Sequence, residues 1–197
     1  MDPSLPPLVL GSSSPFRAEL LGRLRLPFTT AAPDIDETRL PDEAPADMVR
    51  RLTRLKAEAV AADHPRHLII ASDQCAECEG RILGKPGSHE RAVEQLLGFS
   101  GRVVRFHTGL ALLNSATGRL QLDVVPFAVH FRPLDRARVE RYLRAERPYQ
   151  CAGSFKSEGL GITLFRRLEG DDPNALVGLP LIRLVDFLAV EGIELPL

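Results

Sequence analysis

The segment that most constrains the fold is His67-Leu68-Ile69-Ile70-Ala71-Ser72-Asp73, which runs from apolar residues into an acid. Such a run predicts a central strand of a sheet, with Asp73 at its carboxyl end. Open α/β sheets bind their ligands outside the carboxyl ends of their strands. Asp73 therefore marks the place where a ligand site is expected.

Helical and extended patterns alternate along the rest of the chain, without internal repeats or low-complexity tracts. This alternation predicts an α/β fold built on a mixed sheet. Residues 28–45 lack periodicity and predict a long acidic loop, and residues 153–161 predict a loop punctuated by glycines. The expected helices begin at Pro15 and Asp47 and also cover 88–97, 134–144 and 180–190; the expected strands cover 8–10, 67–73, 102–113, 120–131 and 162–165.

The length of 197 residues and the 44% hydrophobic content predict one domain covering 1–197, with residues 1–6 as a flexible leader. The 25 Lys and Arg nearly balance the 26 Asp and Glu, so the net charge of -1 gives no general attraction to nucleic acid or to an anionic membrane. The proline-rich start lacks the basic and apolar regions of a signal peptide, and no apolar run is long enough to cross a bilayer. We expect a cytoplasmic protein with no nucleic-acid or membrane partner.

Three cysteines, an odd number, argue against a disulfide framework and suit a reducing compartment. Cys75 and Cys78 match the spacing C-x-x-C of metal and redox sites. A zinc site would need a second ligand pair at short spacing, but Cys151 stands alone and the five histidines are scattered. We therefore interpret Cys75 and Cys78 as strand or turn cysteines.

A first candidate for anion binding is the serine loop Ser12-Ser13-Ser14, which precedes a helix with Arg17 in its first turn. Unpaired N–H groups and the positive end of the helix dipole favour a phosphate there. The alternative is a serine N-cap beside a solvated arginine. Neither G-x-x-x-x-G-K-S/T nor G-x-G-x-x-G occurs, so a P-loop or dinucleotide-binding fold is not supported.

Two lysines extend this candidate site. Lys56 lies on an expected helix, and Lys85 lies in the turn Gly84-Lys85-Pro86 downstream of Asp73. Each alone would be an ordinary surface lysine. Together with Arg17 they could surround a triphosphate, whose several charges need more than one cation.

Asp73 is the best single candidate for catalysis, because a carboxylate at the end of an apolar strand is partly desolvated and can accept a proton or hold a cation. A helix or turn cap is the alternative role. The loop segment Asp34-Ile35-Asp36-Glu37 supplies further carboxylates, which suit magnesium or manganese bridging phosphate oxygens, although solvated loop acids remain the plain interpretation of Asp34 and Asp36.

The segment Leu10-Gly11-Ser12-Ser13-Ser14-Pro15-Phe16-Arg17 resembles the opening S-x-S-P-x-R signature of the Maf family. Each later motif is short, but their order and spacing cover nearly the whole chain. In chain order these motifs are Asp36-Glu37-Thr38, Lys56-Ala57, Ser72-Asp73-Gln74, Gly84-Lys85-Pro86 and Gly178-Leu179-Pro180.

The resemblance implies a bent mixed sheet with flanking helices, two lobes around a cleft as in inosine triphosphate pyrophosphatases, and often a homodimer. It also implies metal-dependent hydrolysis of a nucleoside triphosphate to a monophosphate and pyrophosphate. In that scheme Asp73 activates water and Glu37 helps with metal or water. The phosphate-binding residues implied by the resemblance are Ser12, Arg17, Lys56 and Lys85.

Three positions depart from the commonest family pattern. Members that favour dTTP and UTP tend to have an arginine at Phe16, a threonine at Gln74 and a glutamine at Glu158. The combination in this chain resembles the branch that hydrolyses 7-methyl-GTP. Two alternatives stay open, namely a pyrophosphatase for dTTP, UTP or other modified nucleotides, and a nucleotide-binding regulator without turnover. Asp73 favours turnover, because an unprotonated carboxylate without a metal would hinder the binding of a polyanion.

Overall fold

A computed structural model describes residues 6–196 of the chain. The expected leader, residues 1–6, therefore lies almost wholly outside the described residues. The chain divides into two compact units: unit 1 comprises Met1–Gln74, Thr108–Val125 and Gly178–Leu197, and unit 2 comprises Cys75–His107 and Pro126–Val177. A single domain covering 1–197 stays a prediction.

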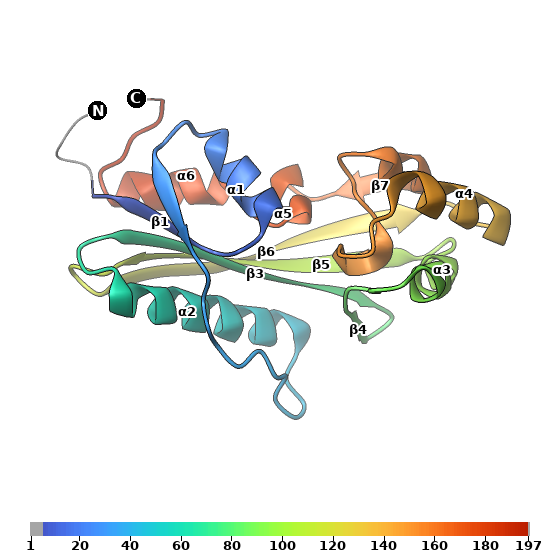
Figure 1. Cartoon of the computed structure of the whole chain (residues 1–197), viewed down its shortest axis with the longest axis horizontal. Coiled ribbons are helices and arrows are strands. Elements are labelled where there is room, and N and C mark those ends of the chain that lie inside the picture. Colours follow the sequence, from blue (N-terminus) through green and yellow to red (C-terminus); the bar gives the residue numbers. More distant parts are fainter. Residues whose placement is uncertain (1–5, 197) are drawn as a thin grey trace. The chain divides into compact units, whose positions relative to one another are not determined.

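A seven-stranded mixed sheet carries the fold, in the order β2-β1-β3-β5-β6-β7, with β4 paired to β3 (Figure 1). β1 is parallel to β2 and β3, whereas β4 and β7 run antiparallel to β3 and β6. The predicted α/β class with a mixed sheet is confirmed. The strands are β1 (Leu8–Gly11), β2 (Phe28–Ala31), β3 (Leu68–Cys78), β4 (Arg81–Leu83), β5 (Val103–Asn114), β6 (Arg119–Phe131) and β7 (Phe165–Glu169).

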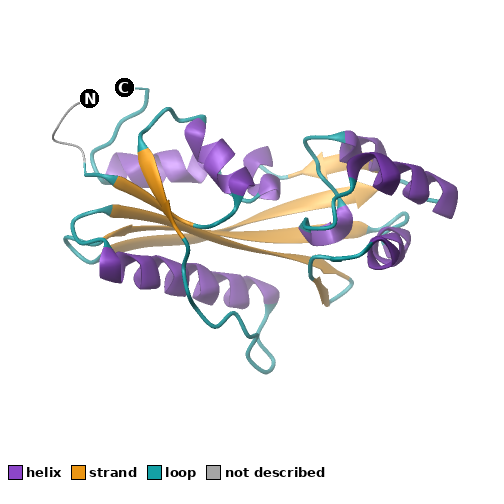
Figure 2. Ribbon diagram, viewed as in Figure 1, coloured by secondary structure: helices purple, strands orange, loops and turns teal. Residues whose placement is uncertain are grey.

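In unit 1, strand residues alternate between the two faces of the sheet. Val9, Ile69 and Ala71 form one apolar cluster with Ala57 and Val60 of α2 (Pro45–Asp63). Helices α1 (Pro15–Gly22) and α6 (Leu181–Val190) lie on the opposite side of the unit 1 strands from α2 (Figure 2). Helices therefore cover both faces of these strands, as expected for strands with continuous apolar runs.

Close packing of α2 on β5 depends on Gly109. A Cβ atom at this position would lie 2.0 Å from Thr53 Oγ1 and 2.9 Å from a methyl group of Val49. Both clashing atoms belong to buried residues of α2, so they have little room to move. Any larger residue at 109 would push α2, and with it Lys56, away from the sheet.

Unit 2 has its own core, in which phenylalanine rings pack edge to face, apart from the tilted pair Phe99 and Phe131. Phe131 contacts Phe99, Phe155 and Phe165 with ring centroids 5.2–5.6 Å apart. The helices around this core are α3 (His89–Gly98), α4 (Arg136–Glu146) and α5 (Pro173–Val177), with the 3₁₀ segments η1 (Ala152–Ser154) and η2 (Leu160–Leu164). Unit 2 thus has a hydrophobic core cluster whose residues all come from unit 2.

Several expected elements differ in the structure. The supposed loop 28–45 opens with the short strand β2, whose half-exposed Phe-Thr-Thr-Ala lacks a clear apolar period because it pairs only with β1. The prediction of a strand at 162–165 is wrong, because the chain forms η2 there and β7 begins only at Phe165. Gly161 packs so closely against the backbone of Lys156 that a Cβ atom on Gly161 would lie 2.2 Å from the Lys156 carbonyl oxygen. The sequence patterns also missed β4 and α5.

Among residues 6–196, no helix combines the length and the apolar character that a bilayer-spanning segment requires.

Candidate functional site

The parallel register of β1 and β3 brings two predicted site segments together. Gly11 is paired with Ala71, so Ser12, which follows β1, comes next to Ser72 and Asp73, which lie in the interior of β3. The prediction that the strand ends at Asp73 is wrong, because the chain continues as β3 to Cys78, where it pairs with β4. Ser14 caps α1, and its Oγ accepts from the N–H of Arg17 at 3.5 Å. The prediction that the serine loop opens a helix is confirmed, and the N-cap is present. The N–H of Ser14 donates to Ser12 Oγ at 3.2 Å, and phosphate binding by the loop stays a prediction.

Arg17 folds back over this loop and does not point into solvent. Its Nη1 donates to Ser12 Oγ at 3.3 Å and its Nε donates to the carbonyl oxygen of Gly178 at 2.9 Å. The same carbonyl accepts from Ser72 Oγ at 2.8 Å. Gly178 has φ +127, a backbone conformation that residues with a side chain rarely adopt. A glycine at this position therefore allows its carbonyl oxygen to accept from both Arg17 and Ser72.

Burial acts on the guanidinium of Arg17. Desolvation lowers its pKa from the ordinary value, while the carboxylates of Asp73 and Glu37 oppose that shift. A desolvated cation interacts more strongly with an added phosphate than a solvated one does, whereas the two nearby carboxylates partly offset its charge. Arg17 is half-buried and bonded to Gly178 and Ser12 beside a serine cap, so it is not a fully solvated arginine, and its phosphate-binding role stays a prediction.

Lys56 and Asp73 form a buried ion pair. Both residues are nearly inaccessible, at 7% and 8% exposed, and Lys56 Nζ lies 2.5 Å from Asp73 Oδ1. Glu37 Oε1 reaches the same ammonium at 2.7 Å from an exposed position. The structure thus gathers three predicted residues from α2, β3 and the acidic loop around one nitrogen. A carboxylate held beside an ammonium can accept a proton from a water molecule.

An ion pair that the sequence did not suggest closes the acidic loop. Glu43 Oε1 and Oε2 accept from Arg51 Nε and Nη2 at 2.6 and 2.7 Å, and Arg51 Nη2 also donates to the carbonyl oxygen of Thr38 at 3.1 Å. The Arg51 guanidinium holds the pKa of the Glu43 carboxyl at about 2. Hydrogen bonds from the Thr38 side chain and from its N–H lower the pKa of the Asp36 carboxyl as well. These contacts fix the loop on which Glu37 lies.

Two predicted specificity residues belong to unit 1. Gln74 is half-buried just after Asp73, and its Nε2 donates to Thr108 Oγ1 at 2.9 Å. Phe16 is half-buried in the first turn of α1, one residue before Arg17. The contact of Gln74 with Thr108 was not foreseen, because β5 is joined to β3 only by tertiary pairing.

The other predicted residues belong to unit 2. Lys85 is exposed after β4, and Glu158 is exposed, with Ser157 Oγ donating to its Oε2 at 3.2 Å. Lys156 pairs with Glu146 at 3.5 Å. The grouping of Lys85 with Arg17 and Lys56, and of Glu158 with Phe16 and Gln74, stays a prediction.

The three cysteines are free, and Cys75 and Cys78 are buried in β3. Their interpretation as strand cysteines is confirmed. Within the described residues, no group of three or more His, Cys, Asp and Glu side chains could hold a metal ion by itself. Asp73 and Glu37 offer two carboxylates that converge on one point, which is the protein contribution that magnesium commonly uses alongside phosphate oxygens and water.

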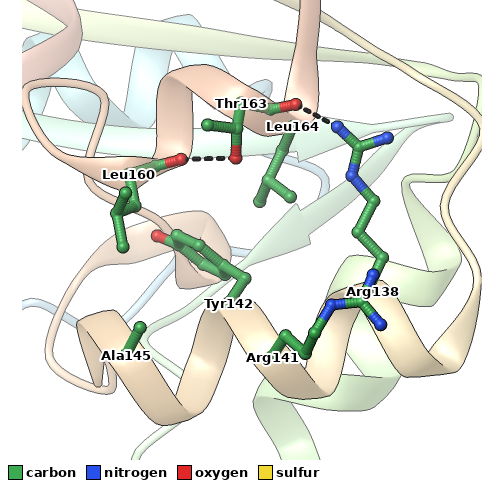
Figure 3. A pocket seen from close by; sticks show the side chains of 7 residues that line it. All are labelled: Arg138, Arg141, Tyr142, Ala145, Leu160, Thr163 and Leu164. Carbon is green, nitrogen blue, oxygen red and sulfur yellow. Dashed lines mark hydrogen bonds between the residues drawn. The ribbon is translucent and has the colours of Figure 1, made fainter.

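A pocket of about 320 Å³ lies in unit 2 between α4 and η2 (Figure 3). One wall is held in place by Arg138, which donates to the carbonyl oxygen of Thr163 at 2.5 Å. None of the predicted site residues lines this pocket, so it is not the site expected from the sequence. Its lining consists of Arg138, Arg141, Tyr142, Ala145, Leu160, Thr163 and Leu164.

Comparison with known proteins decides the family. The model of the family described as Maf-like protein matches residues 7–191. The chain belongs to the Maf family. It is 62% identical over 192 residues to a protein named 7-methyl-GTP pyrophosphatase from Pseudomonas syringae pv. syringae (strain B728a), covering 98% of this chain and 100% of that relative. Relatives with the same name include those of Pseudomonas aeruginosa, at 60% identity over 98% and 100%, and Alcanivorax borkumensis, at 57% over the full length of both chains.

The Maf chain is also similar to the solved structure of the Staphylococcus aureus Ham1 protein. Sequence identity is 17% and the TM-score 0.46, with 63% of this chain and 71% of the other covered. A likeness at this level supports no inference about activity.

Proposed function

We propose that this Maf protein hydrolyses 7-methyl-GTP to 7-methyl-GMP and pyrophosphate. The buried Lys56–Asp73 pair, beside the carboxyl end of β1, is the observation that supports catalysis, and the relatives' shared name supports the substrate. A pure binding site for a polyanion gains nothing from a buried carboxylate. Turnover therefore accounts for Asp73 better than regulation by binding alone.

Asp73 acts as the general base in this proposal. Water adds to phosphorus and loses a proton to the Asp73 carboxylate, and the bond between the α- and β-phosphates breaks to release pyrophosphate. Lys56 holds the carboxylate in place at 2.5 Å and offers its ammonium to a phosphate oxygen. Arg17, which donates to Ser12 Oγ and to the carbonyl oxygen of Gly178, binds phosphate together with Ser12 at the N-terminus of α1. Lys85 keeps the phosphate-binding role that the family resemblance implies.

A divalent cation, magnesium or manganese, would neutralise charge on the phosphates and the leaving group when bound. Glu37 and Asp73 are the residues that would hold it, since their oxygens converge on the ammonium of Lys56. Glu37 is exposed and can turn away from Lys56 without leaving a buried group unpaired.

Base selection is assigned to Phe16, Gln74 and Glu158. The 7-methylguanine ring is cationic, which favours an aromatic face and a carboxylate. Phe16 offers the face and Glu158 accepts from donors on the Watson–Crick edge. Gln74, whose side chain is oriented by its hydrogen bond to Thr108, contributes an amide to the recognition of the base. We place this activity in the cytoplasm, with a small-molecule nucleotide rather than a nucleic acid or a membrane as the partner, in a protein that can form a homodimer.

A nucleotide panel tests the proposal. Purified protein is incubated with 7-methyl-GTP, GTP, dTTP and UTP, and pyrophosphate is converted to phosphate for colorimetric detection. We expect turnover of 7-methyl-GTP well above that of the other three. Preference for dTTP or UTP would support the alternative substrate class, and binding without pyrophosphate release would support a regulator.

A further inference from the structure

We propose that Gln95 is a positioning residue that couples the loop carrying Lys85 to the segment carrying Glu158. This inference rests on the proposed function, which assigns Lys85 to phosphate and Glu158 to the base. Gln95 lies half-buried on α3. Its Nε2 donates to the carbonyl oxygen of Gly84 at 3.1 Å, and its Oε1 accepts from Ser154 Oγ at 2.6 Å. A single amide thus bonds the residue before Lys85 and the start of the Ser154–Glu158 segment.

The Ser154 end of this link supports a strained backbone. Ser154 is fully buried with φ +62, and it follows Gly153 with φ +78. A residue other than glycine in the left-handed region persists only where its surroundings hold it. The short hydrogen bond to Gln95 is such a restraint, because it fixes the only polar atom of the Ser154 side chain.

Farther along, α4 fixes the remainder of the segment. Tyr142 OH accepts from the N–H of Lys156 at 3.1 Å, and Glu146 Oε2 accepts from the N–H of Leu160 at 2.9 Å. Glu158 therefore lies between two backbone N–H groups that α4 holds, and α3 holds the stretch that leads into them through the contact of Gln95 with Ser154. Loss of the Gln95 contact frees that stretch and leaves the two N–H groups attached.

The two coupled segments are also electrostatic neighbours. Burial raises the pKa of the Cys151 thiol; Lys156 and Lys85 oppose that shift and Glu158 adds to it. Charges from both segments thus act on the same thiol. In addition, the N–H of Gly87 donates to the carbonyl oxygen of Tyr149 at 3.0 Å, so the Lys85 loop and the chain before η1 meet at a second point.

The chemistry of the amide allows the two contacts to be removed one at a time. Gln95→Glu keeps an acceptor for Ser154 but cannot donate to Gly84. Ser154→Ala removes the donor to Gln95 and leaves the contact with Gly84. Gln95→Ala removes both. Gln121→Ala is the matched control, since Gln121 is also half-buried and its Nε2 donates to a backbone carbonyl, that of Phe187, at 2.9 Å in unit 1.

Kinetics on 7-methyl-GTP and GTP separate the variants. We expect Gln95→Glu to lower kcat/KM roughly fivefold to tenfold for both nucleotides alike, because only the phosphate-binding loop is released. Ser154→Ala is expected to reduce the preference for 7-methyl-GTP by about the same factor, with little loss on GTP. Gln95→Ala should show both effects and Gln121→Ala neither. Identical profiles for Gln95→Glu and Ser154→Ala, or no difference between Gln95→Ala and Gln121→Ala, would overturn the proposal.

Hydrogen–deuterium exchange provides a readout that does not need activity. In nucleotide-free protein, Gln95→Ala is expected to accelerate amide exchange in both 84–88 and 152–158, whereas Gln121→Ala leaves both unchanged. Unaltered exchange in either segment contradicts the coupling whatever the enzyme hydrolyses. Conversely, accelerated exchange in a protein that releases no pyrophosphate would retain the coupling and reject the proposed function.

Discussion

The guanidinium of Arg51 donates two hydrogen bonds to the carboxylate of Glu43, at 2.6 and 2.7 Å. This pair closes the acidic loop on α2, one turn before Lys56 on the same helix. Because Glu37 reaches Lys56 from that loop, the pair sets where a second carboxylate stands beside Asp73. An ion pair outside the predicted site thus determines whether Glu37 lies within that site.

We expect Glu43→Gln to lower kcat about tenfold, because a neutral amide holds the loop less firmly and Glu37 loses its position. The effect on stability should depend on pH. The folded-state pKa of Glu43 is depressed from 4.5 to about 2, so its stabilising contribution is present above 4.5 and is lost as pH falls toward 2. Melting curves of the two proteins should therefore converge across that acidic range. A constant difference in Tm there would contradict the role of the ion pair.

Asp73→Asn tests the general base. The asparagine keeps the shape of the side chain but cannot take a proton, and loss of a general base commonly lowers kcat by about 10²–10⁴. Nucleotide affinity should persist. Asp123→Asn is a suitable control, because it also removes a carboxylate paired with a cation in unit 1, Arg183 at 2.9 Å. Near-normal kcat in purified Asp73→Asn would show that Asp73 is not the base.

Removal of divalent cations should abolish turnover. Without a metal the pyrophosphate leaving group is poorly neutralised, so EDTA is expected to stop product release and added magnesium or manganese to restore it. Glu37→Gln should raise the metal concentration needed for half-maximal activity, since a neutral amide is the weaker ligand. Full activity in EDTA would rule out the metal requirement.

The phosphate-binding residues should act independently of the base. Arg17→Ala and Lys85→Ala are each expected to lower kcat/KM for every nucleotide by a similar factor, about tenfold or more. Arg54→Ala, which removes an exposed arginine of α2 paired with Glu58, is the control and should change little. A loss confined to one base would contradict the assignment.

Local sequence patterns were sufficient to locate the apolar strand that contains Asp73 and the serine-capped start of α1, but not the continuation of that strand to Cys78. Both depend on residues that are neighbours in the chain: an apolar run before an acid, and Ser14 before Pro15. The pairing of Lys56 with Asp73 was not predicted, because the pattern of a helix gives its buried face but not its partner on the sheet.

Other features depend on contacts between residues far apart in the chain. Ser72 and Arg17 both donate to the carbonyl oxygen of Gly178, which is more than 100 positions away from either. Every residue has a backbone carbonyl, so the sequence does not indicate which one accepts these hydrogen bonds. The strand expected at 162–165 failed for a related reason. Its apolar residues suited a strand, but the close approach of Gly161 to Lys156 bends the chain into η2.

The substrate itself gives the last prediction, because methylation at N7 places a positive charge on a guanine ring that is otherwise neutral. Phe16 can stack on this ring through a cation–π contact worth up to about 2 kcal/mol when desolvated, and Glu158 adds a carboxylate. GTP offers the same donors on its Watson–Crick edge but no charge. The unaltered enzyme should therefore prefer 7-methyl-GTP over GTP by up to about 30-fold from the stacking contact alone.

Phe16→Arg combined with Glu158→Gln should reverse this preference. The cationic ring loses its aromatic face and its carboxylate and meets a like charge, whereas a uracil or thymine edge, which offers both acceptors and a donor, gains an amide that can match it. We expect activity on 7-methyl-GTP to fall and activity on dTTP or UTP to rise in the double variant, with each single variant between the two, measured as kcat/KM on the same panel. Equal turnover of GTP and 7-methyl-GTP by the unaltered enzyme would exclude the proposed base selection, while the roles of Asp73, Lys56 and Arg17 at the phosphates would still stand, because none of them contacts the base in this scheme.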